Sequence, residues 1–395
     1  MKEEFQEILI PDRSATASRK WDNLRERFQR QDLLPLWIAD MDFKAPACVR
    51  QALHAYVDSG AIGYYSTPDA YYDNFIKWES QRHGYRVQRE WIRFSPGVVS
   101  CLHWLTQILT QPGEAVLLQT PVYYPFHHAV TDSGRVLVES PLVNDRGRYA
   151  IDLEDFERKM VEHQVRLFIL SSPHNPVGRV WTREELQAMV DICRRHQVYI
   201  LSDEIHQDIL AFGAKHLPTA LAAPGGYDEG IITLAAASKT FNLAGAQNSY
   251  IIIPDPDLRQ KYDDYMKYLR VFSGNAFGYV AAEAAFGGGA AWLEAVLEEV
   301  AGNFNLLRET LLTAFPRLEL SPLEGTYLAW LDLGAYVPFE RLHDFVENVC
   351  RIAPDYGEWF WPGSAEDCHI RLNLATPRCN IEEACRRLRQ GLETV

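Results

Sequence analysis

Short apolar runs recur between about Ser95 and Ile253, with stretches of helical periodicity between them. Each run is too short to form an independent helix. Short apolar runs that alternate with helices are typical of parallel strands joined by crossover helices and buried on both faces. The pattern predicts one buried, mostly parallel sheet with strands at Ala115–Leu118, Arg166–Leu170, Val198–Leu201, Ile231–Leu234 and Tyr250–Ile253.

One of the crossover helices has clear end signals. Thr182 is a good N-cap, Glu184 and Glu185 fall in the first turn, and Arg194 and Arg195 fall in the last turn. Acids at the start and bases at the end of a helix complement its macrodipole. These signals predict a helix from just after Thr182 to about Arg195.

The pattern changes after about Gly287. A long helix is predicted near Trp292 to Ala314, followed by short strands at Leu328–Leu331 and Ile370–Leu374 and a final helix. The segment before Pro46 has no strong periodicity, and we expect it to pack on this C-terminal part or on a partner subunit. The predicted fold is therefore α/β. Residues 47–286 form a large domain with the mostly parallel sheet, and residues 1–46 and 287–395 form a smaller α+β domain.

Composition narrows the kind of ligand and compartment. A formal net charge of −14 opposes binding to nucleic acid, which requires a surplus of Lys and Arg on one face. The acidic start Met1-Lys2-Glu3-Glu4 does not resemble a secretory leader, and no apolar run is long enough to span a bilayer. The seven cysteines are scattered without a CxxC pair, so neither a metal site nor redox chemistry is indicated. We expect a cytoplasmic protein without a membrane partner.

Lys239 is the most informative residue for chemistry. It follows the apolar run Ile231–Leu234 within the small-residue stretch Ala235-Ala-Ala-Ser-Lys-Thr. Burial there favours the neutral amine, which can condense with an aldehyde. Taken alone, a lysine in this position is more often one that extends its amine to solvent from a strand end.

Two polar residues follow other predicted strands. Asp203, in Leu201-Ser-Asp-Glu-Ile-His, lies where open α/β sheets bind their ligands, and a carboxylate there could keep a pyridine nitrogen protonated. Asn175 lies in Ser171-Ser-Pro-His-Asn-Pro-Val-Gly, a loop stiffened by proline on both sides. The alternatives are a helix-capping aspartate and an ordinary turn asparagine.

Three further features suggest a phosphate, an aromatic ring and a carboxylate. Ser95-Pro-Gly-Val-Val precedes an apolar helix, whose free N–H groups can bind phosphate. Tyr123 follows a strand and could stack on a ring, although core packing is its simpler role. Arg371 lies inside an apolar strand, where either a ligand carboxylate or an internal salt bridge would compensate its charge.

Taken together, these motifs resemble the fold-type I pyridoxal-phosphate enzymes of the aspartate aminotransferase superfamily, over nearly the whole chain. Trp37-Ile-Ala-Asp-Met-Asp-Phe, Asp203-Glu-Ile-His and Ser238-Lys-Thr-Phe-Asn-Leu-Ala-Gly are similar to the branch of carbon–sulfur β-lyases that includes cystathionine β-lyase.

The resemblance implies a role for each residue. The cofactor would be pyridoxal 5′-phosphate, held covalently by Lys239, with Asp203 on its pyridine nitrogen, Asn175 on its 3′-oxygen and Tyr123 stacked on its ring. Asn175 and Tyr64 would also contact the amino-acid substrate, whose α-carboxylate Arg371 would bind. The phosphate would be held by the backbone of Val98 and Val99, by Ser238, and by Tyr64 from the other subunit of a homodimer.

Two positions depart from the aminotransferase pattern. His206 stands where those enzymes carry a tyrosine near the cofactor, and Gln247 stands where they carry a phosphate-binding arginine. Both departures favour a lyase that cleaves cysteine S-conjugates, such as cystathionine, to a thiol, pyruvate and ammonia. An aminotransferase is the alternative enzyme. A pyridoxal-phosphate-binding regulator or partner-binding protein without turnover is a third reading, for which the sequence offers no winged-helix or basic segment.

Overall fold

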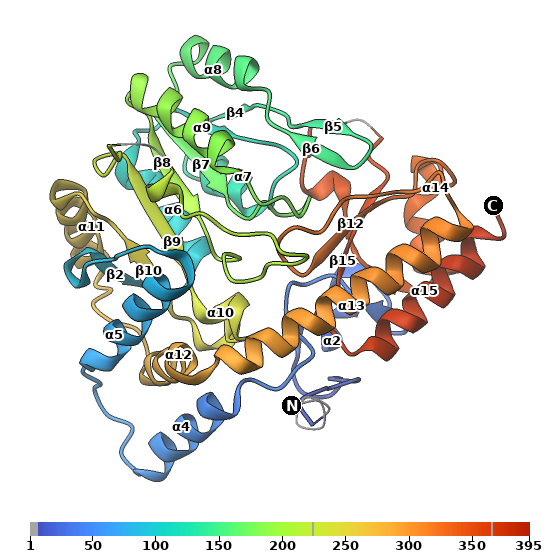
Figure 1. The fold of residues 1–395 in the computed structure, drawn as a ribbon, viewed down its shortest axis with the longest axis horizontal. Coiled ribbons are helices and arrows are strands. Elements are labelled where there is room, and N and C mark those ends of the chain that lie inside the picture. The colour runs from blue at the N-terminus through green and yellow to red at the C-terminus, as the bar shows by residue number, and fades with distance from the viewer. Residues whose placement is uncertain (1–6, 223–224, 365) are drawn as a thin grey trace.

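A seven-stranded sheet forms the centre of the larger part of the molecule (Figure 1). The computed structural model describes residues 7–222, 225–364 and 366–395, so the acidic start at Met1 to Glu4 lies outside the described residues. The strand order is β2-β10-β9-β8-β7-β3-β4. The strands are β2 Ile92–Ser95, β3 Ala115–Leu118, β4 Val136–Glu139, β7 Leu167–Ser171, β8 Tyr199–Asp203, β9 Ile231–Ala235 and β10 Ser249–Ile252. All five predicted strands are confirmed, and β2 and β4 are additional edge strands.

Helices cover both faces of this sheet. In β7, Leu167 and Ile169 pack in a core with α6 Val98–Leu109, α7 Pro125–Thr131 and α11 Pro256–Leu269. Phe168 and Leu170 point the other way, into a core with α8 Leu153–Glu162 and α9 Arg183–Arg195. This alternation follows from the two-residue period of a strand. The α9 helix starts as predicted, with a capping box between Thr182 and Glu185.

The strand β10 differs from the parallel arrangement expected for its run. It pairs antiparallel with both β9 and β2, whereas β4, β3, β7, β8 and β9 are parallel to one another. The connection from β9 holds only the short helices α10 Ala237–Thr240 and η4 Ala244–Ala246. A parallel return requires a crossover along the length of the sheet. This connection instead stays at the carboxyl end of β9, where it carries Lys239.

The C-terminal part begins with the long helix α13 Ala290–Ala314, close to the predicted bounds. It continues with an antiparallel sheet in the order β11-β12-β15-β14, then α15 Arg378–Leu392. The predicted strands correspond to β12 Leu328–Asp332 and β15 His369–Asn373, with β11 at Glu319–Leu320 and β14 at Asp355–Tyr356. The helix α14 Phe339–Asp344 lies between β12 and β14 along the chain.

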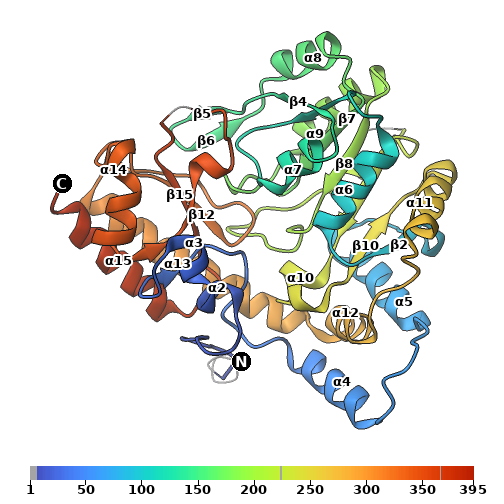
Figure 2. The ribbon, with the colours of Figure 1, turned by 180° about the vertical axis from the view of Figure 1, so that it is seen from behind.

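The N-terminal segment packs on this C-terminal part, as one of the two expected arrangements (Figure 2). It contains α2 Arg19–Asp22, α3 Leu24–Phe28 and β1 Leu34–Pro35, and β1 pairs with β13 Ile352–Ala353. Next along the chain, α4 Ala47–Asp58 packs on α12 Ala276–Gly288, and α5 Asp69–Trp78 continues as η1 Glu79–His83. The division of the chain at residues 46/47 and 286/287 stays a prediction.

Within the described ranges, no single helix has both the length and the apolar character needed to cross a membrane. The pair α12 and α13 meets that criterion only when taken together, and the two helices meet at an angle of 81°.

Candidate active site

The predicted site residues converge on a cavity of about 190 Å³ at the carboxyl ends of the central strands. The loop after β3 contributes Tyr123, β8 ends at Asp203, and the connection after β9 contributes Lys239. Eight of the predicted residues line the cavity: Val98, Val99, Tyr123, Asn175, Asp203, His206, Ser238 and Lys239. Their convergence follows from the sheet, since parallel strands bring their carboxyl ends to one edge.

Lys239 presents a buried amine to this cavity. Its Nζ donates a hydrogen bond to the carbonyl oxygen of Ala39 over 2.7 Å. Burial lowers the pKa of the Lys239 amine to about 8, while the carboxylates of Asp40 and Asp203 oppose the shift. A large fraction of the amine is therefore neutral near pH 8, and a neutral amine is nucleophilic.

Among the residues that the structure describes, Asp203 is a buried carboxyl group without a cationic partner in direct contact. Its Oδ1 accepts a hydrogen bond from the backbone N–H of Ile205 at 3.1 Å. Burial raises the pKa of the Asp203 carboxyl to about 7, although that hydrogen bond and the charge of Lys239 lower it. A ring nitrogen that carried a proton here would compensate the buried charge and hold Asp203 ionised.

Asn175 and His206 lie on either side of this carboxylate along the chain. The Asn175 carbonyl oxygen accepts a hydrogen bond from the Tyr123 N–H at 3.1 Å, which ties the two predicted ring contacts together. Burial lowers the pKa of His206 well below its usual range, so its ring is neutral. Within the described structure the His206 Nδ1 is buried without a hydrogen-bond partner, and it is available to a ligand.

A helix N-terminus forms one end of the cavity. Val98 and Val99 open α6 directly after Gly97, and no side chain in the described part of the chain caps this end. The first-turn N–H groups of a helix lack partners within the helix and favour an anion. Ser238 and Gln247 line the same cavity, so the residue that replaces the arginine is in place but carries no charge.

Arg371 lies next to the cavity but is occupied by internal partners. Its Nη1 donates to the Asn175 Oδ1 at 2.9 Å, and its Nη2 donates to the Trp37 carbonyl oxygen at 3.1 Å and to Asp355. The sequence left open whether a ligand or an internal carboxylate compensates the charge of Arg371, and Asp355 is such an internal carboxylate. The arginine is nevertheless linked to the site through Asn175.

Tyr64 is the one predicted cofactor ligand that lies away from the cavity. Its side chain is fully exposed, in the segment between α4 and α5. Within a single chain it therefore contacts no part of the site, consistent with a role that requires a second subunit.

Ala39 and Tyr327 also belong to the site, although neither was predicted as a site residue. Tyr327 donates a hydrogen bond to the Ala39 carbonyl oxygen at 2.9 Å, the same oxygen that accepts from Lys239. Its ring lies against His206, with ring centroids 5.8 Å apart. Ala39 lies in the motif Trp37-Ile-Ala, which could have pointed to it. Tyr327 comes just before a strand, and no sequence pattern distinguishes such a tyrosine from one that packs in the core.

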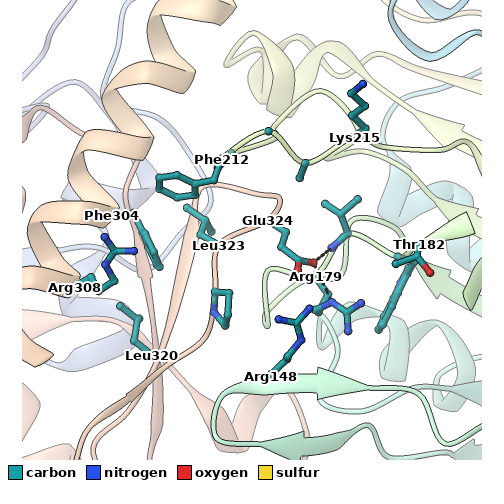
Figure 3. A pocket seen from close by; sticks show the side chains of 16 residues that line it. Arg148, Arg179, Thr182, Phe212, Lys215, Phe304, Arg308, Leu320, Leu323 and Glu324 are labelled. Atoms are coloured by element: carbon teal, nitrogen blue, oxygen red, sulfur yellow. Dashed lines mark hydrogen bonds and ion pairs between the residues drawn. The ribbon is translucent and has the colours of Figure 1, made fainter. Parts of the chain in front are cut away.

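A larger hollow of about 650 Å³ lies elsewhere (Figure 3). It is lined by residues that include Arg148, Phe212 and Arg308, and none of the predicted site residues is among them. Size alone therefore does not identify the site in this molecule. The smaller cavity holds the buried groups with shifted pKa values, which is the usual property of a catalytic site.

Comparison with known proteins identifies the family. Residues 31–388 match the family of class I and II aminotransferases, so the chain belongs to that family. The Bacillus subtilis (strain 168) protein named cystathionine beta-lyase PatB is 38% identical, over 96% of this chain and 98% of that protein.

Solved structures agree with this assignment. Cystalysin from Treponema denticola, which contains a pyridoxal 5′-phosphate cofactor, is 31% identical with a TM-score of 0.93 over 98% of both chains. The PLP-bound C-S lyase from Staphylococcus hominis is 33% identical with a TM-score of 0.90, over 98% of this chain and 97% of that chain.

Proposed function

We propose that this protein is a pyridoxal-phosphate-dependent β-lyase that cleaves cysteine S-conjugates to a thiol, pyruvate and ammonia. The observation that carries the proposal is the pair of Lys239 and Asp203 in one cavity, a buried amine and a buried carboxyl group. Similarity to proteins named cystathionine beta-lyase and C-S lyase favours elimination over transamination.

The residues of the cavity fit this cofactor. Lys239 would hold it covalently, Asp203 would pair with its ring nitrogen, and Asn175 would donate to its 3′-oxygen. Tyr123 would stack on the ring. The N–H groups of Val98 and Val99 would bind the phosphate, with help from Ser238. His206 would be a further polar contact of the cofactor. The bound cofactor supplies a ring that withdraws electrons from the Cα of an attached amino acid.

The chain's own residues perform the remaining steps. Arg371 binds the substrate α-carboxylate, and Asn175 beside it helps to fix the orientation of the Cα–H bond. The Lys239 amine, freed when substrate binds, removes the Cα proton. Asp203 remains ionised and keeps the ring nitrogen protonated. The β-thiolate then leaves, and the remaining fragment hydrolyses to pyruvate and ammonia.

We also propose a cytoplasmic homodimer in which Tyr64 reaches the site of the partner. Exposed apolar side chains gather on α4, the following segment and the start of α12: Val57, Ile62, Tyr64 and Phe277. Such a patch is typical of an interface. The free state of all seven cysteines suits a reducing compartment.

The test is product release from a panel of S-substituted cysteines, assayed with and without an added keto acid. A lyase releases thiol and pyruvate in equal amounts without the keto acid. Turnover that requires the keto acid and releases no thiol would identify an aminotransferase instead.

A further inference from the structure

Arg371 has a guanidinium group that is already largely occupied. Its partners are the Asn175 Oδ1, the Trp37 carbonyl oxygen and the Asp355 carboxylate. Its Nε is buried and has no hydrogen-bond partner among the residues that the structure describes. The Nε–H group is therefore left for a ligand.

Asp355 faces Arg371 directly across the strand pair β14 and β15, where the two residues are in register. Its Oδ2 contacts the Arg371 Nη2, and its Oδ1 is buried and likewise unpartnered within the described ranges. Both side chains are about 2% exposed. The pair is thus electrically neutral, and each member retains one unsatisfied polar atom.

The remaining charges around Asp355 act on it more weakly than Arg371 does. Arg27 of α3 acts on it from a distance and is exposed to solvent, where its guanidinium lies 3.7 Å from the centroid of the Trp359 ring. Tyr123 and Tyr124 also face Asp355, and burial raises the pKa of both phenols above the usual value, so both are neutral. Arg371 therefore provides the one buried positive charge next to Asp355 in the described structure.

We propose that Asp355 controls substrate affinity by competing with the substrate α-carboxylate for Arg371, so that substrate binds with uptake of one proton by Asp355. The inference rests on the proposed function in one respect, since it assumes an amino-acid substrate. Two ionised carboxylates on one buried guanidinium would leave a net negative charge out of water, which is costly. A protonated Asp355 removes that charge and can donate a hydrogen bond from its carboxyl group.

The pH dependence follows from this exchange. Burial raises the pKa of Asp355 to about 6, although the adjacent Arg371 and the more distant Arg27 lower it. Below pH 6 the carboxyl group is already neutral, so substrate binding needs no proton. Above pH 6 the affinity falls about tenfold for each pH unit.

The experiment compares the holoenzyme with its Asp355→Asn variant between pH 5.5 and 8.5. Calorimetry gives the dissociation constant of L-alanine, an amino acid without a β leaving group, and steady-state kinetics give KM for a cysteine S-conjugate. The ratio of the wild-type dissociation constant to that of the variant is used because the ionisation of the ligand itself affects both values equally and cancels. We expect a ratio near 1 below pH 6 that rises to about 100-fold at pH 8. At pH 8, calorimetry in two buffers should show that the wild type takes up about one more proton on binding L-alanine than the variant does.

Asp332→Asn is the matched control, because Asp332 pairs with His369 on the other side of β15 and does not contact Arg371. It should behave as the wild type. Arg27→Gln provides an independent test if Asp355→Asn does not fold. Loss of that cation should raise the pKa of Asp355, so the pH at which substrate affinity begins to fall should move to a higher value.

A wild-type to Asp355→Asn ratio that does not change with pH would overturn the inference, as would weaker binding to the variant at every pH. An unchanged midpoint in Arg27→Gln counts against it as well. If L-alanine binding shows the expected pattern but no conjugate releases thiol, the lyase proposal fails and this one stands. If a conjugate releases thiol but the ratio of wild type to Asp355→Asn does not change with pH, this inference fails and the lyase proposal stands.

Discussion

Lys239 differs from an ordinary strand-end lysine in the surroundings of its amine. The amine is buried, its pKa is lowered to about 8 by that burial, and it contacts a backbone carbonyl instead of a carboxylate. We expect the purified protein to be yellow and to carry a phosphopyridoxyl group on Lys239 after borohydride reduction and peptide mapping. Lys239→Ala should lose the covalent adduct, whereas Lys215→Ala, at an exposed lysine, should keep it. An adduct on another lysine would rule out this assignment.

Substitution of Asp203 should lower turnover more than it weakens retention of the cofactor. The Asp203 carboxylate is the group that can keep the ring nitrogen charged, and the phosphate and ring contacts do not depend on it. We expect Asp203→Ala to lower kcat by ~10²-fold or more in the cofactor-saturated protein, as for loss of a preorganised electrostatic partner. Single-turnover kinetics and cofactor absorbance separate the two effects. Near-normal turnover at full cofactor occupancy would contradict this role.

Not every residue of the site could be predicted from the sequence. Lys239, Asp203 and Asn175 follow apolar strands, so the sheet alone brings them to one edge. Asp355 lies in a two-residue strand within Pro354-Asp-Tyr-Gly, a sequence that is typical of a turn. Its contact with Arg371 depends on the register of β14 against β15, which local pattern does not determine.

At the scale of elements, the predicted strands are those buried on both faces. The strands β2 and β4 at the sheet edges were missed because they mix buried positions with partly or fully exposed ones and carry a weaker apolar signal. The direction of β10 was missed for another reason. Its apolar run does not differ from that of a parallel strand, and only its connection through Lys239 reverses it.

A buried polar network connects η1 to the segment that follows Asp203. The Gln207 Nε2 donates to the Glu79 Oε1 at 2.5 Å, and the Asp208 carboxylate accepts from the Thr240 hydroxyl next to Lys239 at 2.8 Å. Burial raises the pKa of Glu79 to about 8, with Asp208 and Glu204 adding to the shift and His83 opposing it. This network fixes the segment that carries both Asp203 and His206.

Glu79 should therefore make stability depend on pH. Its pKa is raised in the folded state, so its contribution is fully present below the ordinary value of 4.5 and is lost as pH rises towards 8. Glu79→Gln keeps the acceptor for Gln207 and cannot ionise. We expect urea unfolding to show that the variant gains roughly 2–4 kcal/mol over the wild type between pH 5 and pH 8. Glu294→Gln, at a solvent-exposed carboxylate, is the control and should show no such gain. A constant difference across this range would mean that Glu79 is ionised in the folded protein.

At the scale of the whole molecule, the single chain provides a site that lacks one predicted ligand. The segment between α4 and α5 runs along the outside of the molecule (Figure 1). Tyr64 in this segment is fully exposed, while residues at the carboxyl ends of the central strands line the cavity. If Tyr64 completes the site of a partner, each active site requires Lys239 from one subunit and Tyr64 from the other. Defects at these two positions should then complement each other between subunits.

The last prediction tests this by mixing Lys239→Ala and Tyr64→Ala chains after denaturation and refolding. Neither variant alone should show more than residual activity. A hybrid dimer contains one site with both defects and one site with neither, because the intact Tyr64 comes from the Lys239→Ala chain. Random pairing makes about half of the dimers hybrid, so the mixture should regain about one quarter of wild-type activity, and sedimentation should show dimers throughout. Two control mixtures, each variant refolded with itself, should regain nothing. Activity of the mixture equal to the mean of the two variants would show that Tyr64 does not act across subunits.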